Sequence, residues 1–306
     1  MGTPQFAVVC LKRLFEDNFD IVAVVTAADK PVGRGLKIQS SPVKREAEQL
    51  GIPLLQPDNL RDPGFISQIE AYQPDLIVVV AFRILPEILF SIPTYGAINL
   101  HGSLLPKYRG AAPINWAIIN GEKESGVTTF FLQQKVDTGN IISQDKIDIT
   151  PNMTAGELHD KMAVVGSDVL SRTIHLIARG DVKTAHQDES KVTKAPKLHP
   201  QDCLIDFNQS VERVHNFVRG LSPKPGAYTY LQGKRIQLFE TRIIDSVTVS
   251  NLPGVLVAVD EKEQMVIQCN PGWLSVGELK AEGKKRMRVG DYLRGQKLDL
   301  GSQFGS

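Results

Sequence analysis

The sequence contains few cysteines, no long apolar run and no signal segment. Its 306 residues include three cysteines, and because these lie far apart we expect neither a disulfide framework nor a zinc site. No stretch of about 18 consecutive apolar residues occurs, so we expect no transmembrane helix. No positively charged region followed by an apolar region opens the chain, so we expect no secretory signal. A cytoplasmic protein without a metal fits these absences best.

Two common catalytic motifs are missing as well. The nucleophile elbow GxSxG is absent, which argues against a serine nucleophile of the hydrolase type. No GxGxxG follows an expected strand, which argues against a redox role on a dinucleotide-binding fold. The formal net charge is +1, and because a total hides how charges are distributed, it excludes neither nucleic acids nor small molecules as partners.

The length and composition predict two globular domains. A chain of 306 residues exceeds what one compact core usually holds, and 42% hydrophobic and 23% charged residues are ordinary for a globular protein. Residues 182–199 are polar and show no clear period, which is typical of a linker. We therefore expect domains at 1–181 and 200–306.

The first domain alternates apolar runs with helical patterns. Residues 21–26 and 75–81 are rich in Val and Ile without alternating polar residues, which is typical of parallel strands buried on both faces. Further strands are expected at 97–100 and 127–132, and a helix at 155–178. This alternation predicts an α/β fold with an open, doubly wound, Rossmann-like parallel sheet.

Capping residues mark the ends of two further helices. Ser41 followed by Pro42 predicts a helix start, and Gly51 predicts its end. Thr3 followed by Pro4 predicts another helix, which begins almost at the start of the chain. Because a doubly wound sheet normally has a strand before such a turn, we expect the first strand to be missing. Either the chain is truncated or an internal methionine was taken as the start.

The second domain combines one helix with several short strands. Residues 210–220 show a helical pattern. The segments 227–231 and 234–240 flank Gln232-Gly233, which predicts a hairpin. Further strands are expected at 255–259, 264–269 and 273–279. Short strands at such spacing predict a small β-barrel.

Three polar residues lie near the ends of two expected strands. Asn99 and His101 close the strand at 97–100, and Asp137 follows the strand at 127–132. Ligands bind outside the carboxyl ends of strands in open α/β sheets, so neighbouring strands would bring the three side chains together. An Asp can orient an imidazole, and Asn and an imidazolium can both donate hydrogen bonds to an oxyanion. Because no serine or cysteine lies in an obvious nucleophile elbow, the sequence favours direct attack of the substrate's own amine on an activated carbonyl carbon.

Each of these residues also has a structural interpretation. A single His at a strand end is often structural or merely exposed, and Asn99 can be a turn residue. Asp137 with Thr138 and Gly139 can form a loop or a helix cap. From the residues alone, both interpretations stay open.

A longer pattern surrounds these residues. The chain has Asn-x-His at 99–101, Ser-Leu-Leu-Pro-x-x-Arg-Gly at 103–110 and Asp-Thr-Gly at 137–139. This pattern resembles the signature region of the formyltransferases that use 10-formyltetrahydrofolate. The segments GTPQFAV, DKPVGRG, VVVAFRILP and IDFNQSVERVHNFVRGLSPKPGA match, in order, the members of that family that act on methionyl initiator tRNA. The resemblance therefore covers nearly the whole chain.

The resemblance implies a fold, a reaction and a set of site residues. It implies a formyltransferase domain followed by an OB-like barrel, with Asn99, His101 and Asp137 as the catalytic residues. Asn99 and protonated His101 would stabilise the oxyanion formed when the methionyl α-amine attacks the formyl carbon, and Asp137 would orient His101. The folate donor, 10-formyltetrahydrofolate, would be bound by Ser103, Leu104, Leu105, Pro106, Arg109, Gly110, Phe82 and Ile84.

The resemblance also implies contacts with tRNA. The loop 29–37 presents Lys30, Arg34 and Lys37, and in the family this loop reaches the acceptor stem. From residue 197 onward the chain has 15 Lys and Arg against 12 Asp and Glu, and the densest cluster comprises Lys284, Lys285 and Arg286. Phosphate contacts from these residues would make the affinity depend on salt, although a solvated charged surface is the alternative. We expect a monomer without an obligate protein partner.

One departure and several rival functions stay open. Phe82-Arg83 stands where many relatives have Tyr-Gly, and Arg83 would touch the folate or face water. A sugar-nucleotide N-formyltransferase would share the catalytic residues but has less use for a basic second domain. A formyltetrahydrofolate hydrolase usually carries a ligand-binding domain before the catalytic one, and glycinamide ribonucleotide formyltransferases generally end after the first domain. An RNA-binding protein without activity would have no reason to keep all three catalytic residues.

Overall fold

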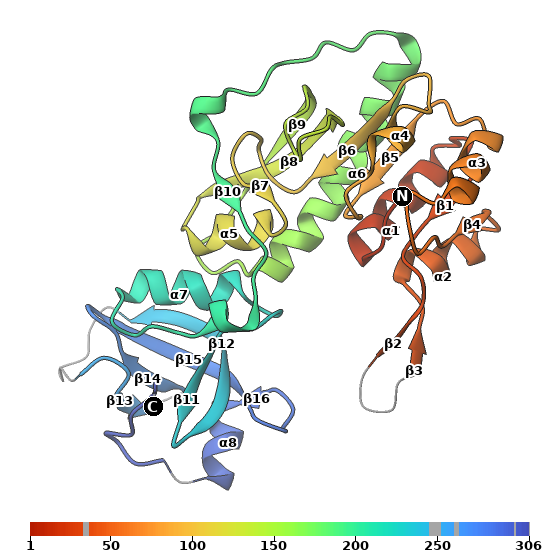
Figure 1. The fold of residues 1–306 in the computed structure, drawn as a ribbon. Helices are drawn as coiled ribbons and strands as arrows, with labels where there is room; N and C mark the ends of the chain where they lie inside the picture. Colours follow the sequence, from red (N-terminus) through yellow and green to blue (C-terminus); the bar gives the residue numbers. More distant parts are fainter. Residues whose placement is uncertain (33–36, 245–251, 260–262, 297, 306) are drawn as a thin grey trace. The chain divides into compact units, whose positions relative to one another are not determined.

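A computed structural model describes residues 1–32, 37–244, 252–259, 263–296 and 298–305 (Figure 1). The chain forms two compact units that are interleaved along the sequence. The first comprises residues 1–110, 125–147 and 159–195, and the second comprises residues 111–124, 148–158 and 196–306. The sequence patterns did not predict this interleaving. The domain boundaries expected near residues 181 and 200 stay a prediction.

The first unit is built on a sheet with the strand order β5-β6-β8-β9. These strands comprise β5 (Ile77–Val80), β6 (Ala97–His101), β8 (Glu124–Phe131) and β9 (Ile141–Asp148). Strand β5 runs parallel to β6, whereas β6 runs antiparallel to β8. The α/β class is confirmed, but the sheet is mixed and not parallel throughout.

Gly2, near the N-terminus, connects this sheet to a smaller one. Strand β1 (Val24–Val25) pairs in parallel with β4 (Leu54–Leu55), so only two residues of the strand expected at 21–26 are paired. The amide of Gly2 donates to Val25 O at 3.0 Å, and Gly2 forms a parallel bridge with Val80. Gly2 thereby lies between the edges of β1 and β5.

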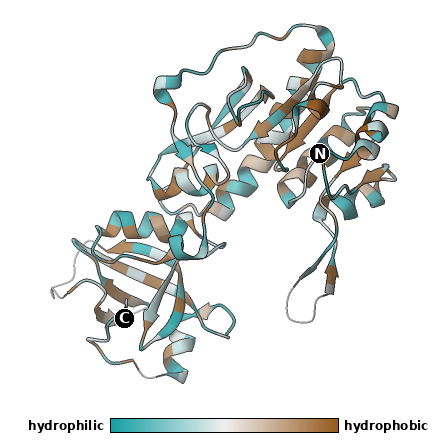
Figure 2. Cartoon of the chain, viewed as in Figure 1, coloured by the Kyte–Doolittle hydropathy of each residue, from teal (hydrophilic) through white to brown (hydrophobic). Residues whose placement is uncertain are grey.

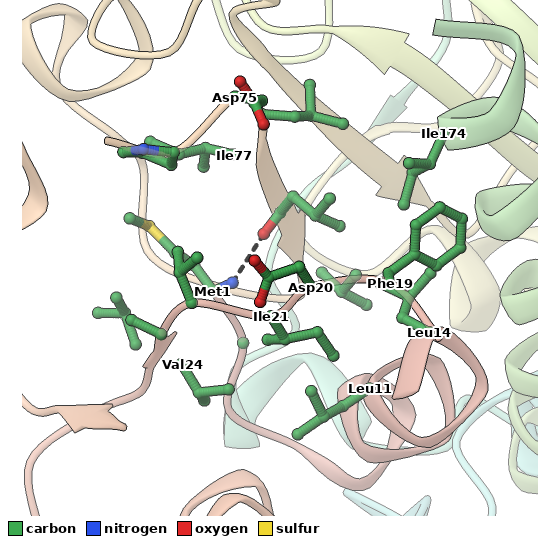
Figure 3. Close-up of a pocket in the computed structure, with 18 of the residues that line it drawn as sticks. Met1, Leu11, Leu14, Phe19, Asp20, Ile21, Val24, Asp75, Ile77 and Ile174 are labelled. Carbon is green, nitrogen blue, oxygen red and sulfur yellow. Dashed lines mark hydrogen bonds between the residues drawn. The ribbon is translucent and has the colours of Figure 1, made fainter. Parts of the chain in front are cut away.

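A cavity of about 520 Å³ lies beside this bridge. Its mostly apolar lining comes from β1, β5 and neighbouring helices and includes Met1, Leu11, Leu14, Phe19, Ile77 and Ile174 (Figure 3). The Met1 ammonium donates to Val78 O at 2.7 Å, and burial lowers its pKa to about 5. The lining includes Val24 and Val25 of β1 and Ile77, Val78 and Val80 of β5.

Of the two helix starts that capping residues predict in the first domain, one is confirmed and one is wrong. Helix α2 (Pro42–Gln49) begins after Ser41, whose Oγ accepts from Lys44 N at 3.0 Å, and ends before Gly51, which has φ +69°. Both ends are as predicted. Helix α1 (Gln5–Glu16) has no side-chain cap, so the expected cap at Thr3 is wrong. Pro4 is still extended, with ψ 177°, and occupies the N-cap position. Thr3 therefore lies one residue before the cap.

The core of the first unit covers both faces of the sheet. Helices α3 (Pro63–Ala71) and α4 (Glu87–Phe90) contribute to one cluster, which contains Val25, Phe65, Ile69, Ile77, Val79 and Leu89. Helix α6 (Ala155–Arg179), expected at 155–178, packs on the opposite face, where Thr173 Oγ1 lies 2.7 Å from Thr129 Oγ1. Apolar residues accordingly concentrate on the central strands (Figure 2).

The second unit is a curled antiparallel sheet with the order β11-β12-β15-β14-β13, and β16 pairs with β15. The strands comprise β11 (Tyr228–Leu231), β12 (Lys234–Ile244), β13 (Leu256–Val259), β14 (Met265–Gln268), β15 (Trp273–Ala281) and β16 (Met287–Arg288). Bridges join Leu231 to Phe304 and Val255 to Gln303, so the C-terminal segment completes a small barrel. The expected β-barrel architecture is confirmed.

The hairpin and the helix expected in the second unit are also confirmed. The hairpin between β11 and β12 turns at Gln232 and Gly233, whose φ values of +51° and +73° suit the primed turns of short hairpins. Helix α7 (Val211–Gly220) begins after Ser210, as predicted. Helices α5 (Pro113–Ile119) and α8 (Val289–Gly295) also belong to this unit.

Candidate active site

Asn99 and His101 lie at the C-terminal end of β6. They are two residues apart, so their side chains share one face of the strand, opposite to the face that packs on α6. Asn99 pairs with Val79 of β5, and His101 pairs with Thr128 of β8. His101 is 6% exposed and Asn99 is half-buried. Strand β6 therefore presents an amide and an imidazole side by side.

The imidazole of His101 is held between a carbonyl and a carboxylate. Its Nε2 lies 2.9 Å from Tyr108 O, and because a carbonyl can only accept, Nε2 carries the proton. Its Nδ1 lies 3.9 Å from Oδ2 of Asp137, which is beyond hydrogen-bond distance. In neutral His101, the lone pair of Nδ1 is therefore on the side of the carboxylate.

Asp137 is buried and has an uncommon backbone conformation, with φ +55°. Its Oδ2 accepts a hydrogen bond from Gly110 N at 2.9 Å. We expected the carboxyl ends of parallel strands to bring Asp137 to His101, and that reason is wrong because β8 runs antiparallel to β6. Asp137 instead comes near His101 through the loop 132–140 between β8 and β9.

The loop that follows His101 is fixed by a hydroxyl group. Thr128 Oγ1 donates to Ser103 O at 2.6 Å and accepts from Leu105 N at 3.1 Å. Gln144 Nε2 donates to Thr128 Oγ1 at 2.8 Å and to Leu105 O at 2.9 Å. Ser103 Oγ donates to Lys107 O at 2.6 Å. The sequence patterns did not single out Thr128 and Gln144, because only the fold brings them to this loop.

The guanidinium of Arg109 binds side chains of the segment 182–199, which we expected to be a linker. Its Nε and Nη2 donate to Gln187 Oε1 at 3.0 and 2.8 Å. Its Nη2 also donates to Glu189 Oε1 at 2.7 Å, and this interaction holds the pKa of Glu189 below its usual value. Leu104, Pro106 and Gly110 lie partly buried on the same loop.

The other expected folate residues follow β5. Phe82 packs against the apolar cluster of the first unit, whereas Ile84 is 74% exposed. Arg83 donates to Pro57 O at 2.7 Å and to Asp58 O at 2.8 Å, so its guanidinium is held by the loop 57–58. A cavity of about 280 Å³ lies beside these residues and is lined by 58–61 and 83–86. The larger cavity, next to Met1, is not lined by Asn99, His101 or Asp137.

The expected tRNA residues belong to two separate groups. Lys30 is exposed on β2 (Lys30–Val32), and Lys37 begins β3 (Lys37–Gln39), which pairs antiparallel with β2. Arg34 lies outside the described residues.

The second group lies in the turn between β15 and β16. Lys284 and Lys285 are exposed there. Arg286 donates to Glu278, lies 3.8 Å from Glu240, and stacks 4.4 Å from the ring centroid of Phe239. Its guanidinium is thus engaged within its own unit.

A short strand pair brings the expected linker to the end of the loop 103–110. Strand β7 (Arg109–Gly110) pairs in parallel with β10 (Lys194–Ala195). Thr193 accepts from Tyr108 N through its Oγ1 at 2.8 Å and from Arg109 N through its carbonyl at 2.9 Å. The polar composition of this segment gave no signal for these contacts.

Two searches of the described residues gave negative results. No group of three or more His, Cys, Asp or Glu side chains that could hold a metal ion occurs among them. In the same part of the chain, no helix is both long and apolar enough to cross a membrane.

Structural comparison shows the fold of the chain. The N-formyltransferase from Helicobacter canadensis, in complex with folinic acid and dTDP-3-aminofucose, superposes with a TM-score of 0.67 and 20% identity, over 94% of this chain and 97% of its own. HypX from Aquifex aeolicus, in complex with tetrahydrofolic acid, superposes with a TM-score of 0.61 and 19% identity, over 84% of this chain and 47% of its own.

Sequence comparison gives closer matches over the whole length. The methionyl-tRNA formyltransferase of Ruminiclostridium cellulolyticum is 42% identical over 100% of this chain and 98% of its own length. That of Geobacter metallireducens is 44% identical over 100% of this chain and 97% of its own. Family models of the formyl transferase domain and of the formyl transferase C-terminal domain match residues 1–174 and 197–297. The chain therefore belongs to the formyl transferase family.

Proposed function

We propose that this chain transfers the formyl group of 10-formyltetrahydrofolate to the α-amine of methionyl initiator tRNA. The proposal is carried by the position of His101 between Tyr108 O and Asp137, in a chain similar over its full length to methionyl-tRNA formyltransferases. The reaction needs a charge stabiliser and a proton acceptor but no covalent nucleophile. Asn99, His101 and Asp137 supply these functions in the proposal.

The direction of the proton transfer follows from the ring nitrogens of His101. Because Nε2 donates to Tyr108 O, Nδ1 is the atom that accepts the proton of the attacking amine. The bond between the amine nitrogen and the formyl carbon forms, the bond from that carbon to N10 of the folate breaks, and the proton passes from His101 to N10. Asp137, 3.9 Å from Nδ1, stabilises the imidazolium that exists between these steps.

Oxyanion stabilisation is assigned to the side-chain amide of Asn99, and to Nδ1–H of His101 once this nitrogen has taken the proton of the amine. The side-chain amide of Asn99 lies on the same face of β6 as His101. In the proposal, the formyl group of the donor lies within reach of both side chains. A hydrogen bond that strengthens as the carbonyl oxygen becomes an oxyanion lowers the barrier selectively.

The folate donor is assigned to the loop 103–110 and to the segment 82–84. The loop is fixed by Thr128 and Gln144, so it can offer backbone groups in a constant geometry. Because the guanidinium of Arg109 is engaged by Gln187 and Glu189, its part in the proposal is to hold the loop and not to contact the folate directly.

The tRNA is assigned to the basic residues Lys30, Arg34, Lys37, Lys284 and Lys285, with a smaller part for Arg286, which is engaged by carboxylates. These side chains would contact phosphates and not read bases. We further propose that the protein acts in the cytoplasm on this tRNA substrate and that it does so as a monomer.

The test is formyl transfer by the purified chain with three acceptors. We expect 10-formyltetrahydrofolate to formylate methionyl initiator tRNA, and to leave a nucleotide-linked amino sugar and water almost unused. Transfer to the amino sugar with no transfer to tRNA would replace the proposal by a sugar-nucleotide N-formyltransferase. Transfer of the formyl group to water, with neither of the other acceptors used, would replace it by a hydrolase.

A further inference from the structure

Gln187 is the centre of a hydrogen-bond network that reaches the candidate catalytic loop. Among residues 183–191 it is the one side chain that is not exposed. Its Oε1 accepts from Arg109 Nε and Nη2, at 3.0 and 2.8 Å. Its Nε2 donates to Asp137 O at 2.9 Å and to Gly139 O at 2.8 Å. All hydrogen-bonding capacity of this amide is therefore used within the first unit.

The network fixes Asp137 from two directions. Gln187 holds its backbone carbonyl, and Gly110 N holds its carboxylate at 2.9 Å. Arg109, which precedes Gly110, is bound to the same Gln187 side chain. The loop around Asp137 has φ +55° at that residue, a conformation that non-glycine residues seldom adopt without support. The support comes from a segment whose composition is that of a linker.

We propose that Gln187 is a positioning residue that sets the carboxylate of Asp137 relative to His101 during formyl transfer. The inference rests on the proposed function, because it assigns a consequence for turnover to a hydrogen-bond geometry. Gln187 itself contacts no reacting atom. A misplacement of a catalytic group by about 1 Å can cost on the order of a hundredfold in rate, so a residue of this kind affects kcat more than KM.

The Gln187→Glu variant separates the two halves of the network. A carboxylate at this position still accepts from Arg109, but it has no hydrogen to donate to the carbonyls of Asp137 and Gly139. We expect Gln187→Glu and Gln187→Ala to lower kcat by about tenfold or more, with KM for both substrates changed less than about threefold. If Gln187 acts only by holding Arg109, Gln187→Glu will keep the wild-type kcat, which overturns the proposal.

A double variant tests whether the effect passes through Asp137. In an Asp137→Asn background, the further change Gln187→Ala should lower kcat by less than about twofold, because residues that act through one another are not additive. Asp188→Ala is the matched control, since within the described residues the Asp188 side chain bonds to Ser190 and Lys191 of its own segment and not to Arg109 or Asp137. We expect it to keep wild-type turnover. Equal losses in the wild-type and Asp137→Asn backgrounds would contradict a positioning role.

A structural readout keeps this inference separate from the proposed function. The amide hydrogen of Gly110 is bound to Asp137 Oδ2, so its hydrogen exchange reports the position of that carboxylate. We expect at least about tenfold faster exchange at Gly110 in Gln187→Ala, without a change at Lys44 N, which Ser41 caps. If Gln187→Ala exchanges faster at Gly110 but the wild-type chain transfers no formyl group to any acceptor, the proposed function alone is wrong. Unchanged exchange at Gly110 overturns the inference about Gln187.

Discussion

Nδ1 of His101 lies 3.9 Å from Oδ2 of Asp137, while Nε2 of the same ring donates to Tyr108 O at 2.9 Å. The carbonyl fixes which nitrogen carries the proton in neutral His101, and the carboxylate lies near the other nitrogen. This arrangement suits a base that becomes positively charged during the reaction. Catalytic hydrogen bonds are often long in structures without substrate and shorten when it binds.

The backbone at Gly110 allows no side chain. A Cβ built there would lie 2.5 Å from Ala195 O, and its φ is +129°. We expect Gly110→Ala to lower the free energy of unfolding by about 3 kcal/mol and to lower formyl transfer, because it separates β7 from β10. Gly51→Ala is the control: its φ is +69°, with no atom within 4 Å of the added Cβ. Chemical denaturation should show a loss of about 1 kcal/mol there, and equal losses in both variants would contradict the account.

His215 makes the stability of the second unit depend on pH. It is 3% exposed, accepts from Thr241 through Nδ1 at 2.8 Å and donates to Pro151 O through Nε2 at 3.2 Å. Burial, with a smaller effect of Arg219 and Arg242, lowers its pKa from 6.5 to about 4. The folded state therefore holds neutral His215, and its contribution is complete above pH 6.5 and lost as pH falls toward 4.

The loss amounts to at most about 3 kcal/mol, since each unit of pKa difference is worth about 1.4 kcal/mol. We expect His215→Asn to lower stability at pH 7.5 and to reduce the difference in unfolding free energy between pH 7.5 and pH 4.5. Urea denaturation at the two pH values measures this. An unchanged difference in the variant would show that other groups cause the pH dependence.

The sequence predicted most of the elements because their signals are local. Ser41 and Gly51 bound a helix, and Gln232-Gly233 forms a hairpin turn, through interactions within a few residues. The direction of β8 relative to β6 has no local signal, so a parallel sheet was expected and a mixed sheet is found. The same limit explains why Asp137 was placed near His101 for the wrong reason.

Long-range contacts of polar residues were the least predictable part of the site. Gln187 lies 50 residues from Asp137 and 78 from Arg109, and its segment has no period that would mark it as structured. The resemblance places Arg109 in the folate loop, but it gives no signal that Gln187 and Glu189 engage the guanidinium. Only the fold shows which polar side chains satisfy one another.

The cavity beside Gly2 offers a test of stability that does not involve the active site. A segment of four apolar, β-branched residues joined to the N-terminus of Met1 would extend along β1 and β5 and fill the volume of about 520 Å³. We expect it to raise the free energy of unfolding by more than about 3 kcal/mol, because each buried apolar side chain contributes about 2 kcal/mol. A Gly-Ser segment of equal length is the control. Equal stability of the two extended chains would show that no strand enters the cavity.

The turn between β15 and β16 carries two exposed lysines and one arginine that is bound by carboxylates. Lys284 and Lys285 are exposed, whereas Arg286 contacts Glu278 and Glu240. We expect the double change Lys284→Ala with Lys285→Ala to raise KM for tRNA about fivefold and to weaken its dependence on salt. Arg286→Ala should change KM for tRNA less than that. A larger effect of Arg286→Ala would assign the tRNA contact to Arg286.

The most direct test of the central claim is His101→Ala, assayed both for formyl transfer from 10-formyltetrahydrofolate to methionyl initiator tRNA and for tRNA affinity. The account predicts that kcat falls by at least about a thousandfold, since general-base and oxyanion functions are lost together, while Kd for tRNA stays within about twofold of the wild-type value. A variant that keeps wild-type kcat, or that loses tRNA binding along with turnover, would contradict it.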